Sequence, residues 1–193
     1  MADLRLFIAA RPPDTVLRGI ADLSGSLGFR GDGVRWLKGD GIHLTLKFLG
    51  STDEAKVEAI GRAVSECARA VGEIRLAVGG VGVFPDMKRA RVIWVGLTGD
   101  IARLESVRNA LEEACFALGF DKEGRAFRPH LTIARVKDRL SFDTIKRIEQ
   151  SGDIMLGDMV VDAIELIKSD LSPSGAAYTT LSHYPLTERR GGI

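Results

Sequence analysis

The chain has 193 residues, which is enough for one compact domain or two small lobes with a sizeable core. Apolar residues make up 45% of it and charged residues 27%, proportions typical of soluble globular proteins. The formal net charge of +1 excludes a strong overall field for holding long duplex nucleic acid, but it leaves room for a short anionic ligand in a local pocket.

The chain carries no pattern typical of secretion or membrane insertion. Its first residues, MADLRLFI, lack the basic segment and long apolar run of a signal peptide. No apolar run approaches the roughly 20 residues that a spanning helix needs. Cys67 and Cys115 fall on the apolar sides of predicted helices, as reduced core thiols do. We therefore expect a cytoplasmic protein without membrane contact, and a monomer.

The first part of the chain alternates apolar runs with amphipathic segments. Prolines 12 and 13 separate a strand from a helix, and Asp53 lies in a run of small oxygen-bearing side chains that favours a helix start. Gly79, Gly80 and Gly82 predict a bend or a close backbone approach within a later strand. The predicted elements are strands at 4–10, 42–49 and 74–84 and helices at 14–27 and 53–71.

The second part continues in the same manner. Ser141 and Asp143 favour the start of a short helix, and a polar loop at 119–128 precedes Pro129 and the strand after it. The predicted elements are strands at 90–97, 130–136, 159–168 and 176–183 and helices at 100–118 and 141–150.

The two halves correspond at a shift of 87 residues, the separation of His43 and His130. Each half reads strand, helix, strand, helix, strand, which predicts a duplicated unit. We expect an α+β fold in which two antiparallel-rich sheets, flanked by helices, surround a central cleft with pseudo-twofold symmetry. Residues 1–193 then form a single bilobal domain, with pseudo-repeats at about 4–84 and 90–170 and a final strand at about 176–184.

The shift superposes two copies of a short motif. His43-Leu44-Thr45-Leu46 recurs as His130-Leu131-Thr132-Ile133. Alternate side chains of a strand share a face, so each histidine points the same way as its threonine while the aliphatic residues face the core. One His-x-Thr is a weak signal, but two copies in matched positions of a repeat predict a joint site.

Paired histidines suit acid–base chemistry. Neutral and protonated imidazole are both accessible near neutral pH, so one can accept a proton from water while the other donates one to a leaving oxygen. This division fits phosphoryl transfer, in which the two oxygens lie roughly in line across phosphorus. The threonines can hydrogen-bond the phosphate or fix the imidazoles.

A metal site is the rival interpretation of two histidines. It normally requires a third or fourth ligand with carboxylate or thiolate character. Neither motif contains an acid, and both cysteines are expected in helices. We therefore expect no metal and no cofactor.

These residues resemble the 2H phosphoesterase superfamily, and specifically its LigT-type RNA 2′,3′-cyclic phosphodiesterase (2′-5′ RNA ligase-like) branch. The resemblance is carried by HLTLKFLG from His43 and by RPHLTIAR from Arg128, with support from Arg35-Trp36 and from GVFPDMKRARVIWVG at 82–96. It covers the chain from about residue 4 to residue 185.

The resemblance implies a metal-independent enzyme that opens a 2′,3′-cyclic phosphate at an RNA 3′ end, such as that of a tRNA half, to leave a 2′-phosphate. By motif position His43 is implied as the proton donor to the departing O3′ and His130 as the acceptor that activates water. Thr45 and Thr132 are implied to hold the phosphate. The reverse reaction is an ATP-independent 2′-5′ ligation.

Three cationic side chains near the motifs are candidate substrate contacts. Arg135 closes the second motif, but strict alternation puts it on the face opposite His130, so that it needs a twist or a bulge to reach a phosphate. Lys47 is expected on the face of His43, although a solvated strand end explains it equally well. Arg128 precedes the second motif in what is otherwise a solvated loop.

Two aromatic side chains, Trp36 and Phe48, are candidates for stacking on a base. Aromatic residues in such positions more often belong to the core. Phe48 is expected on the face opposite His43.

Two alternatives share the same sequence features. One keeps the site but acts on small cyclic nucleotides, ADP-ribose cyclic phosphate or 2′-5′ oligonucleotides, and substrate comparison by kcat/KM distinguishes it. The other is a non-catalytic RNA-end-binding module, against which two intact histidines argue.

Overall fold

The computed structural model describes residues 3–28, 33–172 and 175–187. Short 3-10 turns lie at Gly39–Gly41, Glu54–Lys56 and Met87–Arg89. In chain order the strands and helices are β1 (Asp3–Ala10), α1 (Asp14–Leu27), β2 (Val34–Trp36), β3 (Leu44–Asp53), α2 (Val57–Ala68), β4 (Ile74–Phe84), β5 (Val92–Gly99), α3 (Ile101–Ala117), β6 (His130–Val136), α4 (Phe142–Gln150), β7 (Met155–Val161), β8 (Ala163–Ser172) and β9 (Gly175–Pro185).

One antiparallel sheet in the order β7-β4-β5-β6-β3-β1-β8-β9 organises these elements, with β2 paired on β6. Its two central strands, β3 and β6, pair only at Leu44 and Leu131. The sheet therefore consists of two halves that meet at one residue pair. We call the half formed by β3, β1, β8 and β9 lobe I, and the half formed by β2, β6, β5, β4 and β7 lobe II. The predicted α+β class is confirmed, and the two expected sheets are joined into one.

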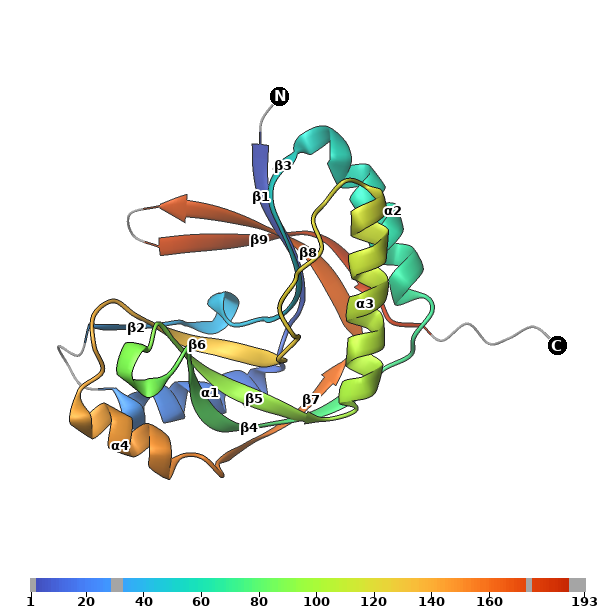
Figure 1. The fold of residues 1–193 in the computed structure, drawn as a ribbon. Coiled ribbons are helices and arrows are strands. Elements are labelled where there is room, and N and C mark those ends of the chain that lie inside the picture. The colour runs from blue at the N-terminus through green and yellow to red at the C-terminus, as the bar shows by residue number, and fades with distance from the viewer. Residues whose placement is uncertain (1–2, 29–32, 173–174, 188–193) are drawn as a thin grey trace.

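Helices cover one face of each lobe. In Figure 1, α2 and α3 run side by side against lobe I, while α1 and α4 pack against lobe II. Most of the periodic apolar side chains of these helices are buried, among them Cys115, whereas Cys67 is half-buried. Burial of such side chains contributes about 1.5–3 kcal/mol each. None of the helices in the described ranges is both long enough and apolar enough to cross a membrane.

The lobes are not consecutive stretches of sequence. The first half of the chain supplies β1, β3 and α2 to lobe I but sends α1, β2 and β4 to lobe II. The second half supplies β5, β6, α4 and β7 to lobe II but sends α3, β8 and β9 to lobe I. There α3 packs on β3, and β8 pairs with β1. Each half thus completes the other's lobe, and the limits of the predicted repeats are not the limits of the lobes.

The predicted strand at 159–168 is wrong, because two strands occupy this stretch. β7 pairs with β4 in lobe II, and β8 pairs with β1 in lobe I. Asp162 is the residue between them, where the chain passes from one lobe to the other. Its carbonyl accepts a hydrogen bond from the backbone N–H of Leu186. Both flanking strands contribute buried apolar residues, so the hydropathy pattern does not reveal the crossing.

Candidate active site

The two His-x-Thr motifs meet where the lobes join. Leu44 and Leu131 form the one residue pair between β3 and β6, and both are fully buried. Each is flanked by its histidine and threonine, whose side chains turn to the face that the helices leave uncovered. In the register of this pair the two histidines occupy diagonal positions, which in a regular ladder are about 7–8 Å apart.

His43 lies in an aromatic pocket of lobe I. Its ring makes edge contacts with Phe7, at 5.4 Å between centroids, and with Tyr178, at 5.0 Å. Only 7% of the residue is exposed, and Nε2 is buried without a hydrogen-bond partner among the described residues. Burial, reinforced by the positive charge of Arg11, lowers the pKa of His43 from 6.5 to about 4.

His130 is the more accessible of the two rings. It packs edge-on against Phe84, with centroids 5.0 Å apart, and lies 6.3 Å from Trp94. Its Nδ1 is 2.6 Å from the backbone carbonyl oxygen of Arg128. A carbonyl oxygen only accepts hydrogen bonds, so Nδ1 carries the proton and neutral His130 keeps a lone pair on Nε2.

A polar cluster lies beside His43 on the same face of lobe I. Arg11 Nε donates to Glu165 Oε2 at 2.7 Å, and Thr180 Oγ1 donates to the same oxygen at 2.9 Å. Nδ1 of His183, the third histidine, is 3.5 Å from Glu165 Oε1. Although burial opposes it, hydrogen bonding to Arg11 and Thr180 holds the pKa of Glu165 below its ordinary value.

Each motif contains a β-bulge three residues after its histidine. On β6, Thr132 pairs with Trp94 and Ala134 with Ile93, so Ile133 is an extra residue. On β3, Leu46 is the extra residue in the same way. A bulge breaks the strict alternation of faces. Both extra residues and the residues after them are buried, which shows that the side-chain order is inverted beyond each bulge.

The inversion turns two candidate residues toward the face on which the histidines lie. Arg135 is exposed between buried Ala134 and Val136, on the same side as His130. Phe48 is 65% exposed and its ring is 6.0 Å from that of Phe7, on the side of His43, so its predicted position opposite His43 is wrong. Arg135 and Phe48 are again 87 residues apart.

The same inversion turns Lys47 away from the face on which the histidines lie. It is only 4% exposed, and its Nζ donates to Glu112 Oε2 of α3 at 2.6 Å and to the carbonyl oxygen of Asp121. Arg108 Nη2 also lies 3.1 Å from the other oxygen of Glu112, in a geometry that makes an ion pair but no hydrogen bond. The predicted contact between Lys47 and substrate is therefore wrong, because the side chain ties β3 to the helix layer.

Trp36 lies on the core side as well. It pairs with buried Ala134 in the β2–β6 ladder and packs against Gly28 after α1, where a Cβ atom would meet its ring nitrogen at 2.7 Å. Base stacking by Trp36 is thus excluded by its position. The side chain of Arg128 is exposed near His130, whereas Arg125 is paired with Glu123 at 2.9 Å.

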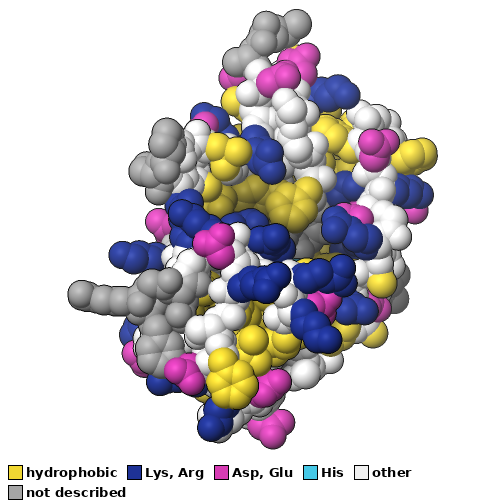
Figure 2. Space-filling view, turned by 60° about the vertical axis from the view of Figure 1, so that its left-hand side comes forward, with side chains coloured by type: hydrophobic (Ala, Val, Ile, Leu, Met, Phe, Trp, Pro, Cys, Tyr) yellow, Lys and Arg dark blue, Asp and Glu magenta, His cyan; other side chains and the backbone are white. Residues whose placement is uncertain are grey.

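One side of the molecule has a mixed surface. Figure 2 views the side on which the β8–β9 hairpin and β2 end, and it shows a hollow with an apolar floor and Lys and Arg side chains gathered beside it. No group of three or more His, Cys, Asp or Glu side chains suited to a metal ion occurs within the part of the chain that the structure describes.

Comparison with known proteins identifies the family. Residues 12–173 match the family described as the 2′-5′ RNA ligase superfamily. The chain belongs to this superfamily. Among its relatives, the RNA 2′,3′-cyclic phosphodiesterase of Methanocaldococcus jannaschii is 32% identical over 182 residues, 94% of this chain and 100% of the relative. The enzyme of the same name from Aeropyrum pernix is 31% identical over 163 residues, 84% of this chain and 92% of the relative.

Solved structures agree with the fold of this 2′-5′ RNA ligase superfamily member. A Thermus thermophilus protein superposes with a TM-score of 0.79 at 25% identity, covering 96% of this chain and 99% of that one. The structure of E. coli LigT complexed with 3′-AMP gives the same TM-score and the same coverage of both chains at 23% identity, which supports the fold alone.

The aromatic walls of the two histidines were not predicted. Phe7 contacts His43 and Trp94 lies near His130, and these two residues are themselves 87 positions apart. Gly82 pairs with Trp94, and a Cβ atom there would overlap the indole ring at 2.2 Å, which explains the predicted close approach in β4. The 87-residue shift relates Phe7 to Trp94 and is the signal in the sequence by which these two residues could have been found.

Replacement of Lys47 tests its structural role. In Lys47→Met the carboxylate of Glu112 loses a buried partner, so we expect the free energy of unfolding to fall by about 3 kcal/mol, measured by urea denaturation. The double variant Lys47→Met/Glu112→Gln should recover most of this loss. At temperatures where Lys47→Met is folded, its KM should be unchanged; a raised KM with unchanged stability contradicts the assignment.

Proposed function

We propose that this protein is an RNA 2′,3′-cyclic phosphodiesterase that opens cyclic phosphate termini to 2′-phosphates by acid–base catalysis between His43 and His130. The observation that carries the proposal is the convergence of both His-x-Thr motifs on one face at the Leu44–Leu131 junction. Relatives that are about 30% identical over most of their length carry this activity in their names. RNA 3′ ends, such as those of tRNA halves, are the proposed substrates.

His130 is proposed as the general base. Its Nδ1–H is held by the Arg128 carbonyl oxygen, so the free lone pair of Nε2 is available to take a proton from the attacking water. This hydrogen bond also stabilises the imidazolium that forms, because the donor becomes more acidic when the ring is charged.

His43 is proposed as the general acid. In the absence of ligand its burial favours the neutral ring, with a pKa of about 4. A bound phosphodiester places a negative charge near the ring, and an opposite charge favours the protonated form. Substrate binding thereby loads the acid with the proton that it gives to the departing O3′.

Two sets of side chains are proposed to hold the substrate. Thr45 and Thr132, both half-buried beside the histidines, would donate hydrogen bonds to the non-bridging oxygens. Arg135 lies on the same face and is suited to bidentate contact with phosphate, and exposed Arg128 adds positive charge. Phe48 offers an exposed ring on which the terminal base would stack.

The activity is tested with a nucleoside 2′,3′-cyclic phosphate in the presence of EDTA. We expect hydrolysis to the 2′-phosphate, and His43→Ala and His130→Ala should each lower kcat by at least about 100-fold, the lower range for acid–base catalysis. His183→Ala, which changes the exposed third histidine, is the matched control and should keep most of the activity. Absence of turnover, or a 3′-phosphate as sole product, contradicts the proposal.

The proton-loading role of His43 is tested by NMR titration of its imidazole. In the free protein we expect a pKa near 4, well below 6.5. Addition of a nucleoside 2′-phosphate should raise that pKa, and for the same reason the pH profile of kcat should lie at higher pH than that of kcat/KM. A His43 pKa that does not respond to the nucleotide rejects the acid role.

The stacking role of Phe48 is tested by Phe48→Ala. Loss of one base–aromatic contact should raise KM for a nucleoside cyclic phosphate roughly tenfold with little change in kcat. Because the ring is largely exposed, the melting temperature should change little. Phe142→Ala removes an even more exposed ring from α4 and should leave KM unaltered; an equal effect in both variants argues against stacking.

A further inference from the structure

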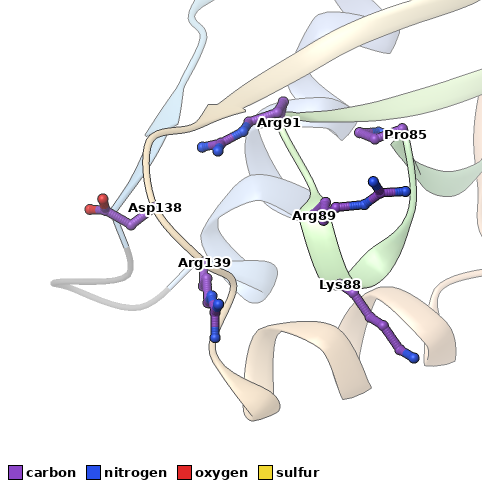
Figure 3. Close-up of a pocket in the computed structure, with 6 residues that line it drawn as sticks. All are labelled: Pro85, Lys88, Arg89, Arg91, Asp138 and Arg139. Atoms are coloured by element: carbon purple, nitrogen blue, oxygen red, sulfur yellow. The ribbon is translucent and has the colours of Figure 1, made fainter.

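A second charged feature lies outside the histidine pair. The turn between β4 and β5 and the loop that follows β6 enclose a hollow of about 480 Å³ (Figure 3). Its described lining residues carry four cationic side chains and one carboxylate, a net charge of +3, on a protein whose overall charge is only +1. The lining residues are Pro85, Lys88, Arg89, Arg91, Asp138 and Arg139.

Most of this positive charge is uncompensated. Among the described residues, the side chains of Lys88 and Arg139 make no hydrogen bond or ion pair, and Arg91 donates through Nη1 to the neutral carbonyl oxygen of Lys137 at 2.8 Å. Of the four cations, Arg89 alone is paired with a described carboxylate, that of Asp86 at 2.9 Å. The carboxylate of Asp138 turns away from the cations toward Gly33, as Figure 3 shows.

The hollow adjoins the candidate active site in two ways. Pro85 follows Phe84, whose ring packs against His130. Arg91 precedes Val92, which pairs with Arg135, and the carbonyl oxygen of Arg91 accepts a hydrogen bond from the backbone N–H of Val136. Arg135 therefore lies between His130 and the hollow along β6.

The spacing decides which ligand can use both sites. Val136 is six residues from His130, and at about 3.3 Å for each residue the hollow lies roughly 20 Å along the strand from the catalytic ring. A single nucleotide held by the histidines does not extend that far, whereas a chain of several nucleotides does. Among the residues that the structure describes, those that line the hollow include no aromatic side chain, so the hollow is suited to phosphates rather than to bases.

We propose that this hollow, together with Arg135, binds backbone phosphates of single-stranded RNA several nucleotides upstream of the cyclic phosphate. The inference rests on the proposed function and deepens it, because it makes an oligonucleotide, rather than a mononucleotide, the preferred substrate. The contacts are electrostatic and independent of base sequence.

The test reverses the two unpaired charges in the variant Lys88→Glu/Arg139→Glu. The substrates are cytidine 2′,3′-cyclic phosphate and an oligoribonucleotide of about eight nucleotides with the same terminus, a length within the range of single-strand sites. We expect kcat/KM for the oligonucleotide to fall at least about tenfold, mainly through KM, while the mononucleotide changes less than about twofold. In a plot of log K for oligonucleotide binding against log[salt], the slope should become less steep by about 1.4, because each of the two lost phosphate contacts contributes about 0.7.

The control variant Arg18→Glu/Arg69→Glu makes the same change in net charge on exposed residues of the helix layer. It should leave both substrates unaffected. The proposal is overturned if the hollow variant hydrolyses the oligonucleotide normally, if it loses both substrates equally, or if the control variant has the same effect.

A binding measurement distinguishes failure of this proposal from failure of the proposed function. Fluorescence anisotropy with the oligonucleotide ending in a 2′-phosphate needs no turnover. If the wild-type protein hydrolyses neither substrate, the proposed function fails, yet weaker oligonucleotide binding by the hollow variant than by the control still supports the RNA site, and equal binding rejects it. Displacement of the oligonucleotide by inorganic phosphate at equal concentration would assign the hollow to a free anion instead and reject the RNA assignment.

Discussion

The backbone pairing of Leu44 with Leu131 is the contact on which the candidate site depends. It is the one residue pair between the two central strands, and it fixes the lateral position of lobe I against lobe II. Because both leucines are buried, their neighbours must turn to the opposite face, and a slip of one residue would bury an imidazole in place of a leucine. The backbone pairing that packs these two leucines in the core therefore also fixes the positions of the two histidines.

The matched bulges at Leu46 and Ile133 extend this constraint along both strands. Each converts the order of faces at the same distance from its histidine, so that one strand presents Phe48 and the other Arg135. A ring suited to a base and a guanidinium suited to phosphate then lie on opposite sides of the junction. The bulge occurs at matching positions of both strands, but the side chain that follows and is exposed differs between them.

The histidines themselves also differ although their positions correspond. His43 is enclosed by Phe7 and Tyr178 next to the charge of Arg11, which favours the neutral ring. His130 is more open, and a backbone carbonyl oxygen determines which of its nitrogens carries the proton. The unequal surroundings of the two equal motifs are the basis on which we propose different roles for the two histidines, a distinction that residue types alone do not give.

The sequence by itself determined the α+β class and most element positions, because hydrophobic periodicity is a local property of the chain, and its 87-residue repeat singled out His43 and His130 as candidates. Only the tertiary structure decided that the two halves exchange helices and strands, since pairing between β8 and β1 depends on contacts distant in sequence. It also decided the faces of Lys47, Phe48 and Arg135. A single extra residue in a strand reverses the faces of the side chains that follow it until another register shift occurs, and the pairing with the neighbouring strand reveals such a bulge where strict alternation does not predict it.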